Sequence, residues 1–375
     1  MHTVFLGLVK DLFTYWFEHP LSSKYSLRNH LDELNDRLFK CKPPQYVQQA
    51  PRKLNDFNNW RAHEFMNFII YFAIPIFYKI MDEEYFKHLL FLIIPIEYLL
   101  SKNINVVNLP SIHKSLCLFV KNLEELYDIH ILKSAAHELL HLTMCTKLLG
   151  PLNQNNCFPF EELNRKVNRY RKGDDLIGDE FLKLLNASKN FSLYIDEIEE
   201  TDTESEFVNF IKNKFEIKSS NIKKKSRELR IKLGKRIDVE LNDYLRLFLN
   251  TIVDISDEPV FYEYVYFNDI MYSIEKDTKY SNSVVFFQDK FGTISYILQN
   301  NNLIYIVCKQ LIFASSPFFN SIEGIKLKSK FSIYSFSNNF FLVEQKDFSL
   351  LKKHFLFKNN CECLLSSFHG SHLFS

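Results

Sequence analysis

The sequence predicts an α+β fold in which a mostly helical N-terminal region is followed by a small antiparallel β-barrel or sandwich. Residues 1–190 contain amphipathic segments with apolar residues at helical spacing, and they lack the alternation that is typical of strands. Beyond about residue 258 the sequence consists of short runs rich in Phe, Tyr, Ile and Val, separated by Asn, Asp, Ser and Gly. We therefore expect a helical domain over 1–190, a charged linker with helical segments over 191–257, and a β-rich domain over 258–375 with a frayed C-terminal tail.

The helical segments are separated by short breakers such as Lys42-Pro43-Pro44 and Gly150-Pro151. We expect helices over 3–18, 24–39, 60–80, 82–101, 111–126, 129–148 and 159–171. Two of the segments contain strongly apolar runs, Met66–Tyr78 and Leu89–Leu100. Each run is interrupted by a proline and falls short of the roughly 20 residues that a membrane span needs. We expect these runs to be buried core helices and expect no membrane partner.

The strands of the C-terminal region are expected to be short and antiparallel. They are predicted at Val260–Phe267, Ile270–Ile274, Ser283–Phe287, Thr293–Leu298, Leu303–Cys308, Phe331–Phe336 and Phe340–Val343. Aromatic residues within them fit a core, whereas exposed aromatic residues would fit a platform for a peptide or a single-stranded nucleic acid. The sequence leaves these two alternatives open.

Charge is balanced over the whole chain, with 46 Lys+Arg against 45 Asp+Glu, but it is not evenly distributed. An acidic stretch at 196–206 is followed by a basic stretch at 218–236. The two stretches belong to the charged linker, which we expect to be helical in its second half. The basic stretch includes Lys223, Lys224 and Lys225. It predicts a nuclear-import signal or a contact to the DNA backbone, and the alternative is a solvated linker.

Glycine and cysteine usage excludes several classes of protein. There are only 8 Gly and no G-x-G pair, which excludes a dinucleotide-binding fingerprint. The spacing of Gly173 and Gly178 is followed by Asp179-Glu180, which excludes a phosphate-binding loop of the Walker type. The 7 Cys include no C-x-x-C pair, as expected for a reduced intracellular protein. Near the C-terminus a tight C-x-C pair and two histidines predict either a second metal cluster or a frayed tail: Cys361, Cys363, His369 and His372.

The most prominent short motif is H-E-L-L-H at residues 137–141. On a helix His137 and His141 lie one turn apart on the same face, where both imidazoles can bind one Zn²⁺. Glu138 would then be a general base, and Glu161 a third ligand, in a zinc hydrolase. The alternative is an amphipathic helix whose leucines face the core and whose histidines lie at its edge.

Five ordered motifs extend this pattern over about residues 1–190. The chain reads MHTVFLGLVK from residue 1, CKPP at 41–44, WRAHEF at 60–65, HELLHL at 137–142 and GPLNQNNCFPFEELN at 150–164. In this order and spacing it resembles the region of unknown function downstream of the catalytic core in CACTA-type (En/Spm-like) DDE transposases and their domesticated relatives. The resemblance implies that the helical region is a partial RNase H-like or transposase C-terminal module.

The resemblance also implies roles for individual residues. Glu161 corresponds to the last carboxylate of the DDE triad, and His137, His141 and His2 correspond to zinc ligands. The E-x-x-N motif opens a basic helix that would hold the DNA backbone. Its expected DNA-binding residues are Asn164, Arg165, Lys166, Arg169, Arg171 and Lys172. Glu64 also matches the family, and we expect it to be a structural first-turn acid beside an anchoring Trp60.

The two aspartates of the triad belong to a core that would lie upstream of residue 1. We therefore expect an N-terminally truncated remnant of a DDE transposase that does not cut DNA by itself, and in which Mg²⁺ would bind only if that core were present. Its expected partners are DNA and other transposase subunits, and its expected location is the nucleus or otherwise the cytoplasm. A zinc hydrolase using Glu138 and a metal-free interaction module remain as alternatives.

Overall fold

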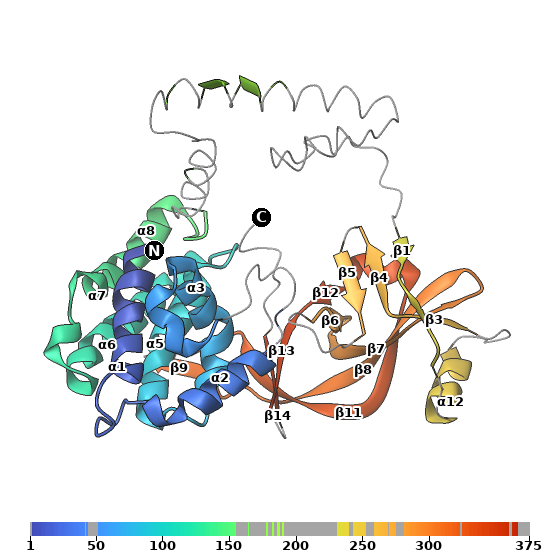
Figure 1. Cartoon of the computed structure of the whole chain (residues 1–375), viewed down its shortest axis with the longest axis horizontal. Helices are drawn as coiled ribbons and strands as arrows, with labels where there is room; N and C mark the ends of the chain where they lie inside the picture. Colours follow the sequence, from blue (N-terminus) through green and yellow to red (C-terminus); the bar gives the residue numbers. More distant parts are fainter. Residues whose placement is uncertain are drawn as a thin grey trace. The chain divides into compact units, whose positions relative to one another are not determined.

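The computed structural model describes residues 2–41, 43, 52–154, 231–239, 243–252, 259–268, 270–274, 281–322, 325–359 and 362–366, with isolated helical residues between 164 and 190 (Figure 1). The chain divides into two compact units, residues 1–156 with 231–375 and residues 157–230. All elements named below belong to the first unit. Helices and antiparallel sheets occupy separate parts of the chain, which confirms the α+β class.

The N-terminal part is built from helices, as expected. Its elements are η1 (Thr3–Val9), α1 (Lys10–Phe17), η2 (Arg28–His30), α2 (Leu31–Lys40), η3 (Leu54–Asn59), α3 (Ala62–Asn67), η4 (Phe68–Phe72), α4 (Ala73–Phe77), α5 (Glu83–Leu99), η5 (Val106–Asn108), α6 (Leu109–Leu126), η6 (Ile129–Ile131), α7 (Ser134–Glu138), η7 (Leu139–His141) and α8 (Leu142–Leu149). The elements η1 and η4 are π-helical turns that run directly into α1 and α4. None of the helices described combines the length and the apolar composition that crossing a bilayer requires.

The core of this helical region is aromatic. Phe13 is fully buried and contacts six other rings at centroid distances of 5.2–5.7 Å. Those rings belong to Trp16, Phe17, Phe57, Trp60, Phe65 and Phe68. The apolar runs at 66–78 and 89–100 lie in this core as helices, which confirms the expectation that they are buried. Pro95 lies inside α5 without ending it.

His88 of α5 is a buried titratable group in the same core. Its Nε2–H donates to the carbonyl of Phe119 at 2.9 Å, and its ring stacks on the Phe119 ring at 4.3 Å. Burial lowers the pKa of His88 from 6.5 to about 4, although the hydrogen bond to Phe119 acts in the opposite direction. His88 is therefore neutral in the folded chain over a pH range in which an unfolded histidine is charged.

This difference predicts a pH dependence of stability. Between pH 6.5 and about 4 the unfolded chain binds a proton at His88 that the folded chain does not. The free energy of unfolding should therefore decrease as the pH is lowered from 6.5 to about 4, by on the order of 2–3 kcal/mol. Below about pH 4 the effect of His88 should level off. His88→Phe, which keeps a stacking ring, should flatten the decline in urea titrations at pH 7, 6, 5 and 4. An unchanged slope in that variant would contradict the assignment.

Among the described residues, the C-terminal part contains an α-helix, a short 3₁₀ helix and three antiparallel sheets. Its elements are β1 (Ile231–Leu233), β2 (Arg236–Ile237), α12 (Asp243–Ile252), β3 (Val260–Tyr262), β4 (Tyr264–Phe267), β5 (Ile270–Ser273), β6 (Val284–Phe287), β7 (Lys290–Asn300), β8 (Leu303–Ser315), β9 (Phe319–Ile322), β10 (Ile325–Lys328), β11 (Phe331–Glu344), η8 (Gln345–Leu350), β12 (Lys352–Lys353), β13 (Phe355–Asn359) and β14 (Glu362–Ser366). A three-stranded sheet has the order β1-β4-β5, and the main sheet has the order β12-β6-β7-β8-β11-β14-β13.

The main sheet is formed around two long strands, β8 and β11. Strand β7 pairs with β8 on one side, while its other side pairs with β6 at residues 290–293 and with β3 at residues 297–299. Alternate residues of β8 enter different clusters, because successive side chains of a strand point to opposite faces. Ile306 lies in a core shared with the three-stranded sheet, whereas Val307 packs with Leu249 of α12.

Two expectations about this region need correction. The sheet does not close into a barrel among the described strands, since β12 and β13 lie at opposite ends of the strand order. The second half of the linker expected over 191–257 contains the helix α12 (Asp243–Ile252), but it is not helical throughout, because residues 231–233 and 236–237 form β1 and β2. Cross-strand pairing decides this local structure: Leu233 lies opposite Val265 of β4, and Ile237 lies opposite Phe261 of β3.

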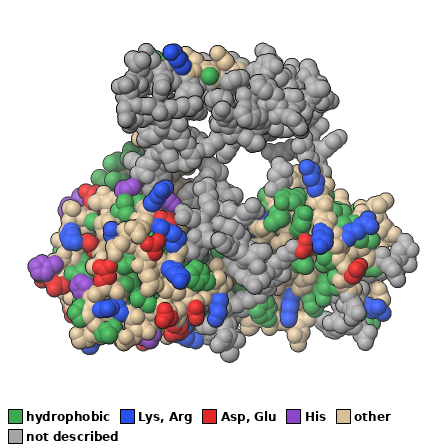
Figure 2. All heavy atoms as spheres, in the orientation of Figure 1, with side chains coloured by type: hydrophobic (Ala, Val, Ile, Leu, Met, Phe, Trp, Pro, Cys, Tyr) green, Lys and Arg blue, Asp and Glu red, His purple; other side chains and the backbone are tan. Residues whose placement is uncertain are grey.

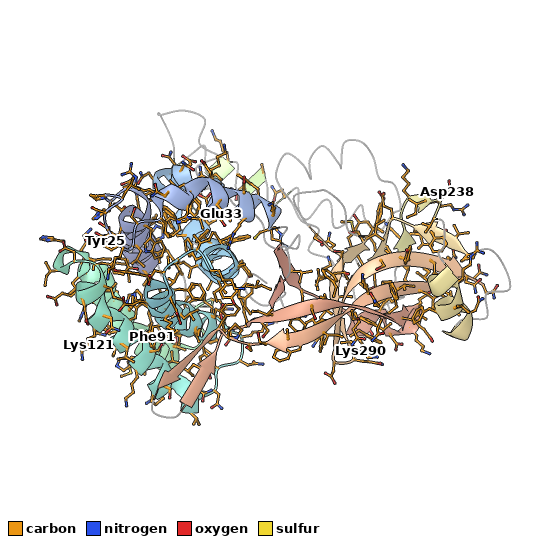
Figure 3. All side chains as sticks on the ribbon, turned by 90° about the horizontal axis from the view of Figure 1, so that it is seen from below. Tyr25, Glu33, Phe91, Lys121, Asp238 and Lys290 are labelled. Atoms are coloured by element: carbon orange, nitrogen blue, oxygen red, sulfur yellow. The ribbon has the colours of Figure 1, made fainter. Side chains whose placement is uncertain are left out.

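A hairpin connects the sheet to the helical region. Strands β9 and β10 lie between β8 and β11 in the chain, and β9 contacts α5 and α6, the helices that carry Phe91 and Lys121 in Figure 3. At its base Phe318 is 1% exposed and packs against Tyr78 and Phe86 at ring distances of 5.0 and 6.2 Å.

A buried ion pair lies beside this hairpin. Glu97 of α5 accepts hydrogen bonds from the Ser329 hydroxyl at 3.1 Å and from the Lys330 backbone N–H at 3.2 Å. The Lys330 Nζ lies 3.9 Å from Glu97 Oε1 and 4.6 Å from the centre of the Tyr71 ring. Both side chains are less than a tenth exposed, at 7% and 6%. Burial raises the pKa of Glu97 and lowers the pKa of Lys330, while the opposite charge of each partner counteracts both shifts.

Candidate functional site

The two histidines of the H-E-L-L-H motif lie on the continuous helical segment formed by α7, η7 and α8. Small and apolar residues on one side of this segment are buried, namely Ala135, Ala136, Leu139 and Leu142. His137 and His141 lie on the opposite side and are exposed. Figure 2 shows exposed histidine side chains (purple) on the surface of the helical region. The amphipathic pattern therefore directs the two histidines outward.

The two imidazoles approach each other closely. Their Nε2 atoms lie 3.0 Å apart, and the ring centres lie 4.8 Å apart with an angle of 78° between the planes. Two imidazole nitrogens bound to one tetrahedral zinc at about 2.0–2.1 Å would lie about 3.3 Å apart. The pair is thus within a few tenths of an ångström of the geometry of two ligands on one cation. Without a metal, one imidazole donates an Nε2–H to the other.

Packing against α6 positions the helix that follows the pair. The His113 Nδ1 lies 3.1 Å from the hydroxyl of Thr143, which is buried in α8. The His113 Nε2 lies 3.5 Å from the Cys117 sulfur, one turn further along α6. His113 belongs to no recognisable motif of the sequence, although its spacing from Cys117 places both residues on one helical face.

The N-terminal helix runs along α7 in the opposite direction. Asp11 of α1 accepts a 2.9 Å contact from Lys133 Nζ, and a Cβ added at Gly7 would lie 2.7 Å from the Cβ of Ala135. The two helical segments are therefore antiparallel. The start of η1, next to His2, lies toward the end of α7 that carries His137. Glycine is required at position 7 because the two backbones approach so closely there.

Of the further ligands expected beside the histidine pair, His2 is described and does not join it. In the part of the chain that the structure describes, no group of three His, Cys, Asp or Glu side chains is arranged to hold a metal ion. The structure brings His137 and His141 together but does not bring His2 into that set. Glu138 is exposed on the same helix. Glu161, which both the hydrolase and the transposase hypotheses use, lies outside the described residues.

Most of the expected DNA-binding residues also lie outside the described residues. Only Asn164 is described, as an exposed residue in helical conformation. The residues that are not described are Arg165, Lys166, Arg169, Arg171, Lys172, Lys223, Lys224 and Lys225. Of the C-x-C pair and the two histidines near the C-terminus, only the backbone of Cys363 is described, as part of β14.

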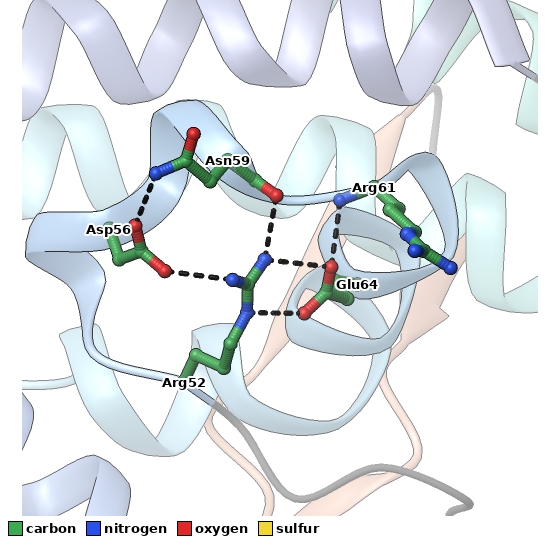
Figure 4. Close-up of polar contacts among 5 residues, drawn as sticks. All are labelled: Arg52, Asp56, Asn59, Arg61 and Glu64. Atoms are coloured by element: carbon green, nitrogen blue, oxygen red, sulfur yellow. Dashed lines mark hydrogen bonds and ion pairs between the residues drawn. The ribbon is translucent and has the colours of Figure 1, made fainter.

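Glu64 has the structural role that the sequence analysis expects (Figure 4). Its carboxylate accepts from the Arg61 backbone N–H at 2.8 Å, which caps the start of α3. The same carboxylate binds the Arg52 guanidinium at 2.7 and 3.0 Å, and that guanidinium also contacts Asp56 at 2.8 Å. Such a bidentate pair fixes geometry as well as charge. The network holds η3 against α3 and does not present a carboxylate to a ligand.

Comparison of the chain with protein-family models, with curated proteins and with solved structures finds no match.

Proposed function

We propose that this chain is a transposase-derived DNA-binding protein whose helical region, a transposase C-terminal module, carries a zinc site at His137 and His141. The ordered motifs over about residues 1–190 support the derivation. The outward pair of imidazoles with a 3.0 Å separation of their Nε2 atoms is the observation that supports the metal. Zinc at this position would hold α7 and α8 in place ahead of the E-x-x-N motif and its basic residues.

The proposal gives the chain a binding role and no cleavage role. The resemblance accounts for one triad carboxylate, Glu161, and a two-metal site needs further acidic ligands to hold its ions. The basic residues after Glu161 would contact phosphates irrespective of base sequence, because such contacts carry no sequence information. Binding to DNA in the nucleus is consistent with this role, either alone or together with other transposase subunits.

The zinc content of the purified full chain tests the metal. We expect about one zinc per chain by elemental analysis, and loss of that zinc in the double variant His137→Ala/His141→Ala. His130→Ala is the matched control, because His130 is an exposed histidine of the same region with a side chain that is 84% accessible. The control should keep the metal. A wild-type chain without zinc, or a double variant that retains it, would contradict the zinc site and the hydrolase alternative together.

The same preparations test DNA binding through fluorescence anisotropy with a 30-base-pair duplex. Reversing the charges of Arg165, Lys166 and Arg169 should weaken binding and reduce the salt dependence by roughly 0.9 per lost phosphate contact. Reversal of three exposed lysines, Lys24, Lys40 and Lys121, is the control and should have a smaller effect. Equal effects of the two sets would contradict a DNA contact at the basic segment. If the wild-type chain hydrolyses an unfolded protein substrate and the variant Glu138→Gln does not, the zinc belongs to a hydrolase instead.

A further inference from the structure

The end of the basic stretch 218–236 forms one edge of the three-stranded sheet β1-β4-β5. Strand β1 pairs antiparallel with β4, and the register places Lys232 directly opposite Tyr266. The backbone N–H of Gly234 donates to the carbonyl of Tyr264, and the carbonyl of Lys235 accepts from Glu263, which keeps the chain beside β4 after β1 ends. The last cations of the stretch are thus fixed to a folded surface.

Two tyrosines lie on the outward face of this sheet. Val265, Phe267 and Tyr272 are buried in the core shared with the main sheet. Because side chains alternate along a strand, Tyr264 and Tyr266 point away from that core. Tyr266 is 37% exposed and Tyr264 is half-buried. Their rings form an edge-to-face pair, with centres 5.7 Å apart and planes at 84°.

The absence of a side chain at Gly234 positions the first of these rings. A Cβ at Gly234 would lie 2.4–2.6 Å from three atoms of the Tyr264 ring, so the ring rests directly on the β1 backbone. Any other residue at this position would displace the ring. The edge-to-face contact then orients Tyr266, which stands opposite Lys232. The aromatic pair is therefore fixed in place before any ligand binds.

Positive charge borders the tyrosine pair. Lys232, Lys235 and Arg236 are all exposed, and none of the three forms an ion pair with another described residue. Within residues 231–239, 259–268 and 270–274 the acidic side chains are Glu263, which is half-buried, and Asp238, beyond β2. In the sequence these cations end a stretch of nine Lys and Arg with a single acid, Glu228.

We propose that the outward face of the β1-β4-β5 sheet binds single-stranded nucleic acid, with unpaired bases stacked on Tyr266 and Tyr264 and phosphates bound by Lys232 and Lys235. Fixed aromatic rings beside cations are the combination that binds single strands without sequence preference. A duplex cannot use the rings in this way, because its bases are already stacked on one another. The proposal is independent of the zinc site, which lies on other elements.

Binding of a fluorescein-labelled 20-nucleotide oligo(dT) to the full chain tests this surface by anisotropy at 50 mM salt. We expect the double variant Tyr264→Ala/Tyr266→Ala to raise the Kd by about tenfold or more, as expected for lost base stacking. The variant Tyr264→Phe/Tyr266→Phe keeps the rings and should bind within about twofold of wild type. Lys232→Glu/Lys235→Glu should weaken binding and reduce the salt dependence by roughly 0.7 per lost phosphate contact.

Matched controls use other exposed residues of the same region. Phe313→Ala removes an aromatic ring of β8 that is 57% exposed, and Lys290→Glu reverses an exposed lysine at the start of β7. In Figure 3, Lys290 lies apart from Asp238, the residue that follows β2. Both controls should leave the Kd nearly unchanged. Circular dichroism and the thermal midpoint establish that each variant is folded.

Several results would overturn the proposal. The proposal is wrong if the wild-type chain does not bind oligo(dT) at micromolar concentration. It is also wrong if the double alanine variant binds like wild type. A loss of affinity in the phenylalanine variants equal to that in the alanine variants would show that the hydroxyl groups act rather than the rings. Tighter binding of a 20-base-pair duplex, with the same dependence on the tyrosines, would also exclude the single-stranded ligand. Loss of zinc in His137→Ala/His141→Ala should not change this binding.

Discussion

Glu97→Ala should lower the free energy of unfolding by about 3–5 kcal/mol, because it removes one partner of a buried ion pair. The substitution leaves the ammonium of Lys330 in a site that is 7% exposed and takes the acceptor away from the Ser329 hydroxyl and the Lys330 backbone N–H. Urea denaturation followed by circular dichroism measures the effect. It should appear in the unfolding of the helical region and of the sheet, because Glu97 contacts both.

Two further variants separate the charge from the packing. Glu84→Ala removes an exposed acid of the same helix and should change stability by about 0.5 kcal/mol or less. Glu97→Leu combined with Lys330→Met replaces the pair with apolar side chains of similar size and should recover most of the loss, since buried ion pairs often break even against apolar packing. If Glu97→Ala is as mild as Glu84→Ala, the ion pair does not contribute in the way described.

Phe13→Ala is expected to have a comparable effect, about 3–5 kcal/mol, because it leaves a cavity in a close-packed core. The Phe13 ring is fully buried and touches six aromatic neighbours that come from α1, η3, the residue that follows η3, α3 and η4. These neighbours cannot all move inward together, since they come from several elements that are themselves packed in the core. The thermal midpoint and the urea midpoint should both fall.

The control for this variant is Phe39→Ala, which removes a phenylalanine ring that is 51% exposed at the end of α2. It should change the free energy of unfolding by about 0.5 kcal/mol or less. Phe13→Leu keeps most of the side-chain volume and should cost less than Phe13→Ala. If the leucine and alanine variants are equally destabilised, ring contacts rather than the cavity account for the loss.

Local patterns predict most of the helices that the structure describes, whereas the helix expected over 159–171 lies outside the described residues except for Asn164. The segment 82–101 is expected to be helical, and α5 spans Glu83–Leu99 after Asp82, whose carboxylate accepts from the Glu84 N–H at 3.0 Å. Capping and an apolar face are properties of neighbouring residues, so the sequence contains them. Pro95 does not end the helix because the residues around it, such as Ile94 and Ile96, are held by packing on all sides.

The lengths of the strands depend on partners far away in the chain. The sequence predicts a strand that ends at Cys308, where the continuous apolar run stops, whereas β8 continues to Ser315. It continues because residues 309–315 pair with β11. The register of this pairing shifts between Phe336 and Phe340. In the same way the predicted strand Val260–Phe267 is divided at Glu263 into β3 and β4, which pair in different sheets.

The candidate metal site is predictable only in part. The i, i+4 spacing of His137 and His141 is enough to predict two adjacent imidazoles, because helical geometry fixes their relation. A third ligand depends on tertiary packing and has no local signal. The tyrosine pair on the β1-β4-β5 sheet has the same limitation, since Gly234 and Tyr264 meet only after β1 pairs with β4.

The buried contact between Glu97 and Ser329 spans 232 residues of sequence. During synthesis on a ribosome, α5 emerges long before the hairpin that completes its surroundings, and its carboxylate must stay hydrated or protonated until Ser329 and Lys330 arrive. The early helices therefore cannot reach their final stability as an independent folding unit. A chain ended before residue 329 would carry the acid Glu97 in its core without a counterion. The helices therefore depend on the later, C-terminal part of the chain to reach their folded state.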